Sequence, residues 1–150
     1  MTVIDRFTLD TNLLIYAVDH ADPVKQVLAD RLLRVLYVKR LPLPLQALNV
    51  FYRATTSKRL LTSIEATDFI EDALNFVTVA SATEEDLFQA IYLHRHHKAQ
   101  FFDCLLLATA ARSGCTTLFS EDFQDGRTYG NITVRNPFAL AEADLAALTA

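Results

Sequence analysis

Three aspartates stand beside apolar runs, and this placement constrains the fold more than any other feature of the sequence. Asp10 follows the apolar run 7–9, Asp103 separates two phenylalanines from the apolar run 104–108, and Asp122 closes the run that begins at residue 116. A carboxylate at the end of a buried segment is costly unless it faces a cation or hydrogen-bond donors. A fold that gathers the three acids would therefore create a site for a hard cation.

Each acid also has an ordinary structural interpretation. Asp10 could cap a helix, as aspartates after strands often do. Asp103 begins a helical segment, where the helix dipole favours a negative charge. Glu121, Asp122 and Asp125 precede Gly126 and could form a solvated turn. The sequence alone leaves these structural roles open beside the metal-binding one.

The size and composition of the chain indicate one domain. A chain of 150 residues with 51% hydrophobic and 21% charged residues can bury one sizeable core, so we expect a single domain over 1–150, with 138–150 as a peripheral tail. No apolar run approaches the roughly 20 residues of a membrane helix, and the N-terminus does not resemble a signal peptide. These features predict a soluble cytoplasmic protein with no membrane association. Cys104 and Cys115 lie in apolar sequence and are expected to be reduced core residues.

Charge is distributed unevenly along the chain. Residues 1–60 carry nine lysines and arginines against five aspartates, whereas residues 61–150 carry five against thirteen acids. The first part could present a basic surface, including Arg53 and Lys58, to a polyanion such as RNA. The alternative is that these charges are the ordinary solvated faces of amphipathic helices.

Apolar runs and helical periodicity alternate in a pattern typical of an α/β fold. The patterns predict strands at 7–9, 76–79, 116–120 and 132–135, with the second of these buried. Helices are predicted at 23–37, 45–57, 63–76, 84–97 and 102–113. Pro42 and Pro44 interrupt the chain between the first two helices, and Gly114 is expected to end the last one.

Several motifs together resemble the PIN-domain proteins of the VapC-like toxin type. They are Leu-Asp-Thr-Asn at 9–12, the segment 101–111, Gly114-Cys115, the segment 118–126 and Asn-Pro-Phe at 136–138. The order of these motifs covers nearly the whole chain. The resemblance implies a three-layer α/β/α sandwich around a mostly parallel sheet. It also implies an endoribonuclease that depends on Mg2+ or Mn2+, a cognate antitoxin partner and a homodimer.

The same resemblance assigns roles to individual residues. Asp10, Asp103 and Asp122 match the first, third and fourth acids of the family and are the expected catalytic residues and metal ligands. Asn12 is the polar neighbour of the first acid and is expected to contact the substrate. Arg53 and Lys58 are expected to contact it as well, but this expectation comes from the basic charge of residues 1–60 and not from the resemblance. Glu121 and Asp125 flank the fourth acid and could assist or replace it, and Asp125 is included among the candidate metal ligands.

One position departs from the family pattern. Relatives carry a glutamate, the second acid, where this sequence has Val50, and an apolar side chain cannot bind a cation. Gln46 and Asn49 are close in sequence and could each supply a neutral oxygen, which would be a weaker ligand. The remaining acids could hold one metal ion, because Mg2+ needs only one or two carboxylates beside a substrate phosphate.

Two other functions remain open. The absent glutamate favours a PIN-fold module that binds RNA or an antitoxin and has lost cleavage. A different metal-dependent phosphohydrolase is also conceivable, but a site of the haloacid-dehalogenase type would require Asp-x-Asp, and Asn12 stands at its second position.

Overall fold

A mainly parallel sheet between helical layers organises the computed structural model, which describes residue 4 and residues 6–149. The strands are β1 (Phe7–Leu9), β2 (Pro42–Pro44), β3 (Thr78–Ala80), β4 (Thr117–Phe119), β5 (Thr128–Tyr129) and β6 (Ile132–Arg135). The helices are α1 (Thr11–Val18), α2 (Pro23–Val38), α3 (Leu45–Ser57), α4 (Ser63–Phe76), α5 (Glu84–His97), α6 (Phe101–Arg112) and α7 (Glu142–Thr149), and a 3-10 turn, η1, spans Pro137–Ala139. None of the described helices is long and apolar enough to cross a membrane.

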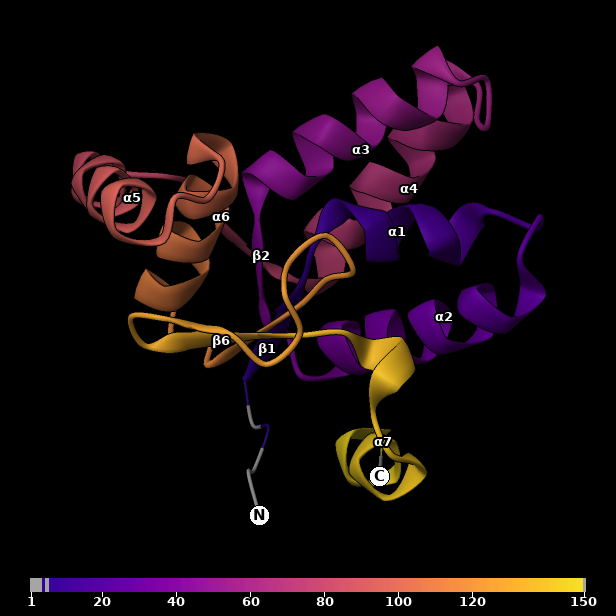
Figure 1. The fold of residues 1–150 in the computed structure, drawn as a ribbon. Coiled ribbons are helices and arrows are strands. Elements are labelled where there is room, and N and C mark those ends of the chain that lie inside the picture. The colour runs from indigo at the N-terminus through magenta and orange to yellow at the C-terminus, as the bar shows by residue number, and fades with distance from the viewer. Residues whose placement is uncertain (1–3, 5, 150) are drawn as a thin grey trace.

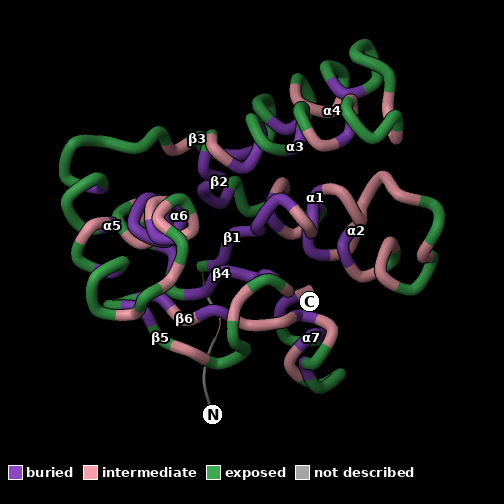
Figure 2. The backbone as a smooth tube through the Cα atoms, turned by 45° about the horizontal axis from the view of Figure 1, so that its top comes forward, coloured by how far each residue is buried: buried purple, intermediate pink, exposed green. Residues whose placement is uncertain are grey.

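The central sheet has the strand order β1-β4-β6-β5. β1 and β6 run parallel to β4 on either side of it, and β5 pairs antiparallel with β6. Helices α5 and α6 cover one face of this sheet, and α1 and α2 lie on the other (Figures 1 and 2). The structure thus has the α/β architecture, with helices on both sides of a mainly parallel sheet, that the sequence predicts.

Apolar side chains of the paired strands β1 and β4 form the centre of the core. All three residues of β1 and of β4 are buried, and the rings of Phe7 and Phe119 lie 5.1 Å apart across the two strands. Strands of a parallel sheet that are buried on both faces appear in the sequence as continuous apolar runs. The polar residues that follow these runs are therefore carried to the edge of the core.

The second, small sheet corrects two expectations. Pro42 and Pro44, predicted as an interruption, form β2, which pairs with β3 alone; proline is tolerated in such a strand because no further ladder requires its missing N–H. The strand predicted at 76–79 begins two residues later, at Thr78, because α4 continues to Phe76. It is also not buried, since β3 is an outer strand whose residues are exposed or half-buried.

Helix ends follow the local signals. Thr83 and Asp86 form a reciprocal capping box at the start of α5, and Gly114 adopts a φ of +92° after α6. The segment after β6 returns to the helical layer as η1 and α7. α7 buries Leu145 and Leu148 and packs against α2, where Arg31 donates a 3.1 Å hydrogen bond to Thr149.

Candidate active site

The ends of β1 and β4 lie side by side and carry the central polar groups. Leu9 pairs with Phe119 in register, so Asp10 and Ser120 leave the two strands at the same level. The Ser120 hydroxyl donates to Oδ2 of Asp10 at 2.8 Å and accepts from the backbone N–H of Asp122 at 3.0 Å. Asn12 donates to the same hydroxyl at 3.3 Å. Ser120 thus connects Asp10, Asn12 and the main chain at Asp122.

Asp10 has both a structural and an electrostatic role. It caps α1, because Oδ1 accepts from the backbone N–H of Thr11 at 2.7 Å. The pKa of Asp10 is raised to about 6, mainly by burial. Its two hydrogen bonds lower the pKa, and the negative charges of Asp122 and Asp103 contribute to the rise. A buried carboxylate facing two other acids is a place where a cation would be stabilised.

Asp103 lies in the first turn of α6 and interacts electrostatically with Asp10 and Asp122. Burial raises the pKa of Asp103, and the charge of Asp122 adds to this. The three acids therefore lie within electrostatic reach of one another, on elements that are far apart in the sequence. Among the described residues, no three histidines, cysteines, aspartates or glutamates are arranged so that they could hold a metal ion by themselves.

The loop after β4 is fixed by ion pairs. Glu121 accepts hydrogen bonds from Tyr16 and from Lys25, the latter at 2.9 Å. Burial raises the pKa of Glu121, but these two donors together bring it below its usual value. At the other end of the loop, Asp125 accepts from the backbone N–H of Asn136 at 2.8 Å and lies 3.7 Å from Arg135.

The expected substrate-binding residues are divided between two places. Asn12 and Lys58 line one cavity of about 460 Å³ between α1 and the turn after α3. Arg53 is exposed on α3, and its side chain forms no hydrogen bond or ion pair with the residues that the structure describes. The structure thus places Lys58 and its neighbour Arg59 along the same cavity as Asn12.

Val50 lies on α3 with 45% of its surface exposed, so it does not belong to the core. α3 is held against the start of α1, because Thr11 donates from its hydroxyl to the carbonyl of Ala47 at 3.0 Å. Gln46 donates to the carbonyl of Phe102 at 3.0 Å, and it borders a separate cavity of about 250 Å³ with Asn49. None of the site acids lines that cavity.

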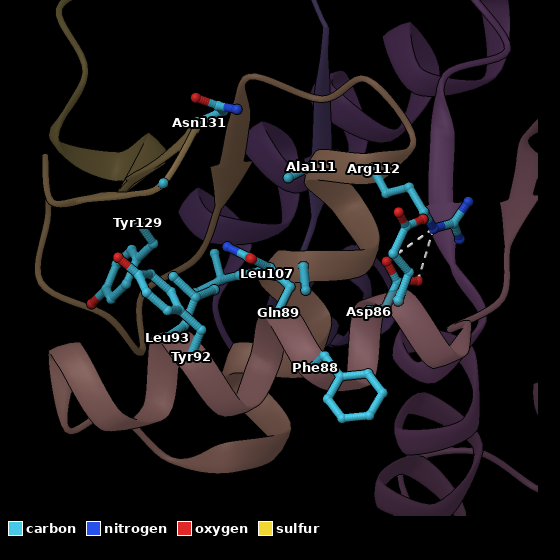
Figure 3. Close-up of a pocket in the computed structure, with 13 residues that line it drawn as sticks. Asp86, Phe88, Gln89, Tyr92, Leu93, Leu107, Ala111, Arg112, Tyr129 and Asn131 are labelled. Carbon is cyan, nitrogen blue, oxygen red and sulfur yellow. Dashed lines mark hydrogen bonds and ion pairs between the residues drawn. The ribbon is translucent and has the colours of Figure 1, made fainter.

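A further cavity is not lined by Asp10, Asp103 or Asp122. It has a volume of about 620 Å³ between α5, α6 and the β5–β6 turn (Figure 3). At one end Arg112 donates from Nε to both oxygens of the buried Asp86 at 2.9 Å, and from Nη2 to the carbonyl of Ser81. Because Asp86 also caps α5, this ion pair ties the start of α5 to the end of α6.

Sequence reasoning missed three residues of the site. Ser120 appeared only as the end of a strand, although its position two residues before Asp122 was a usable signal. Tyr16 and Lys25 had no signal, because their partner Glu121 is about a hundred residues away in the sequence.

The fold of the chain is similar to several solved structures over most of its length. Mycobacterium tuberculosis VapC20, a toxin that cleaves the sarcin-ricin loop, is 18% identical with a TM-score of 0.59, over 77% of this chain and 91% of that one. Rickettsia felis VapBC2, solved on a promoter DNA fragment, is 13% identical with a TM-score of 0.66, over 88% and 98%. FitAcB from Neisseria gonorrhoeae is 15% identical with a TM-score of 0.65, over 89% and 99%. No curated protein sequence matches the chain.

The sequence itself carries the family assignment. The pattern that describes the PIN domain matches residues 7–128, which run from the first residue of β1 into β5 and include Asp10, Asp103 and Asp122. The arrangement of sheet and helices agrees with that of the VapC structures. The chain therefore belongs to the PIN domain family and has a VapC-like fold.

Proposed function

We propose that this protein is a metal-dependent endoribonuclease and the toxin of a toxin-antitoxin pair. The observation that carries the proposal is the junction at Ser120, which holds the buried Asp10 carboxylate and the main chain of Asp122 at the carboxyl ends of two parallel strands. Ligands of α/β proteins commonly bind at this edge of the sheet. The sarcin-ricin cleavage of the similar VapC20 supports RNA as the substrate.

The donor atoms around the junction suit Mg2+ or Mn2+. All are carboxylate, hydroxyl or amide oxygens, and Oδ1 of Asn12 is buried without a hydrogen-bond partner among the described residues. Asp10, Asp103 and Asp122 would hold the ion together with a phosphate of the RNA. Asp125 is a further candidate ligand, although it would first have to leave Asn136 and Arg135. A bound divalent ion would acidify the attacking water and offset charge on the leaving oxygen.

Hydrogen bonds and an ion pair within the chain orient the groups of the proposed active site. Thr11 and Ser120 each bond one oxygen of Asp10, so this carboxylate cannot rotate freely. The ion pair of Glu121 with Lys25 restrains the loop that carries Asp122. Asn12, Arg53 and Lys58 would contact the RNA. Such fixed groups lower the barrier because little reorganisation remains for the reaction step.

The proposal includes two protein partners, a cognate antitoxin and a second copy of the chain. Similar folds were solved as VapBC complexes, some on DNA, which supports a cognate antitoxin for this chain. A homodimer is proposed on the family resemblance. Co-expression with the antitoxin should relieve any growth arrest that the chain causes on its own.

A second candidate is favoured by Val50. If the site requires an acid on α3, the exposed valine leaves a PIN-fold module that binds RNA or an antitoxin without cleaving RNA. The deciding experiment incubates the purified chain and its Asp10→Asn variant with structured and unstructured RNA, with Mn2+ or with EDTA. Cleavage by the parent in Mn2+ alone supports the nuclease. Binding by both proteins without cleavage supports the binding module.

A further inference from the structure

A cavity lined by Asn12 has the features of a nucleotide subsite. Its volume of about 460 Å³ lies within the range of about 300–1,000 Å³ that is typical of small-molecule sites. One wall is the face of α1 with Asn12, Ile15 and Tyr16, and the other is the turn after α3 with Lys58, Arg59 and Leu60. The two helices lie against each other in Figure 1.

The cavity is connected directly to the proposed catalytic residues. Asn12 lines it and donates to the Ser120 hydroxyl, which in turn bonds Asp10. The other atom of the same amide group, Oδ1, is buried and has no partner among the described residues. Asn12 therefore belongs to the junction and to the cavity at once, and it links the cavity to Asp10 through the Ser120 hydroxyl, whereas Asp10, Asp103 and Asp122 do not line the cavity themselves.

Two free cations face this space. Lys58 and Arg59 are exposed, and their side chains form no ion pair or hydrogen bond within the described part of the chain. Asp19, the one acid in the lining, accepts from the backbone N–H of Ala21 at 2.9 Å. Two unpaired cations suit a phosphate group. The apolar side chains beside them suit the base or sugar attached to that phosphate.

Arg59 occupies a backbone conformation that does not favour arginine. Its φ is +57°, and Leu60 donates to the carbonyl of Thr55 at 2.9 Å in the helix-ending turn where glycine is usual. A residue other than glycine in this conformation costs stability, of order 1 kcal/mol. Glycine would therefore be less strained than arginine at this position.

We infer that this cavity binds the nucleotide next to the cleaved bond, with Lys58 and Arg59 on its phosphate and Ile15 and Leu60 beside its base or sugar. The inference rests on the proposed function, because it takes RNA as the ligand. It adds Arg59 and the cavity to the proposed site. It also assigns Lys58 to the lining of this cavity, and not only to a general basic surface.

The test measures RNA binding without cleavage. Fluorescence anisotropy of a short labelled single-stranded RNA is recorded in EDTA at several salt concentrations, for the parent, Arg59→Gly and Lys58→Ala. Each variant should bind several-fold more weakly, and the slope of log affinity against log salt should fall by about 0.7 for each lost phosphate contact. Arg59→Gly should melt no lower than the parent, because glycine relieves the positive φ.

Arg40→Gly is the matched control. Arg40 also has a positive φ, of +50°, but it enters β2 at the end of the strand away from α3, and it donates to the carbonyl of Asn75. The Arg40→Gly variant should bind RNA as strongly as the parent. Equal losses in Arg40→Gly and Arg59→Gly, or none in Arg59→Gly and Lys58→Ala, would overturn the subsite and leave the nuclease standing. No RNA binding by the parent would overturn both.

Discussion

The Ser120 hydroxyl donates a 2.8 Å hydrogen bond to Oδ2 of Asp10 and so joins the end of β4 to the end of β1. The same oxygen accepts from Asn12 and from the backbone N–H of Asp122. One buried hydroxyl therefore organises three segments of the proposed active site, two of them 110 residues apart.

Ser120→Ala should lower both stability and cleavage. The substitution leaves one oxygen of Asp10, the amide of Asn12 and the N–H of Asp122 without their partner, and an unsatisfied buried polar group costs about 1–3 kcal/mol. Urea unfolding should show a loss of that size. Ser113→Ala is the control, because the Ser113 hydroxyl only donates to Thr109 within one helix end. Similar losses in the two variants would argue against a special role of Ser120.

Metal-free protein should lose stability through Asp10 as the pH rises. The pKa of Asp10 is raised from 3.8 to about 6 mainly by burial, so the unfolded chain ionises first and the folded state is destabilised between about pH 4 and pH 6. Asp10→Asn removes this titration. In EDTA, the stability of Asp10→Asn relative to the parent should therefore increase by about 2 kcal/mol from pH 4 to pH 7. A difference independent of pH would contradict the burial of this charge.

The loop after β4 should depend on Glu121. Glu121→Gln weakens the ion pair with the half-buried Lys25, which is expected to contribute less than about 1 kcal/mol to stability. Cleavage should fall more than stability, because the loop that carries Asp122 becomes less restrained. The matched control is Asp30→Asn, which breaks the exposed pair with Arg34 on α2 and should change neither property. Normal cleavage by Glu121→Gln would show that this ion pair does not position Asp122.

Val50→Glu should strengthen metal binding. Val50 is 45% exposed on a helix, so glutamate there should change stability in EDTA by no more than about 0.5 kcal/mol. Added Mg2+ or Mn2+ should then raise the melting temperature of the variant more than that of the parent. Val27→Glu, at a 63% exposed position of α2, controls for the added charge. An equal metal response in the two variants would place Val50 outside the site.

The sequence predicted the architecture well where apolar runs and caps are local signals. β6 and α5 lie where the patterns place them, at 132–135 and 84–97. The sequence did not predict α1, because most of its residues are apolar and show no helical periodicity. It also did not predict β5, which is only two residues long. The strand character of Pro42–Pro44 depends on pairing with β3, which no local pattern reveals.

The sequence singles out Asp10, Asp103 and Asp122 because a charge next to an apolar run is unusual, and their catalytic and metal-binding roles stay predictions. The connections between the segments of the proposed site are not visible in the sequence. The pairing of Glu121 with Lys25 and the cavity between Asn12 and Arg59 arise from tertiary packing of distant segments. Residues that act through such contacts carry no signal in a single sequence.

Cleavage of one labelled RNA by the parent and by Asp10→Asn tests the central claim most directly. The parent should produce defined fragments in Mn2+ or Mg2+ and none in EDTA, and Asp10→Asn should produce none under any condition while still binding the RNA. Fragments formed equally by both proteins, or by the parent in excess EDTA, would contradict a metal-dependent nuclease site built around Asp10.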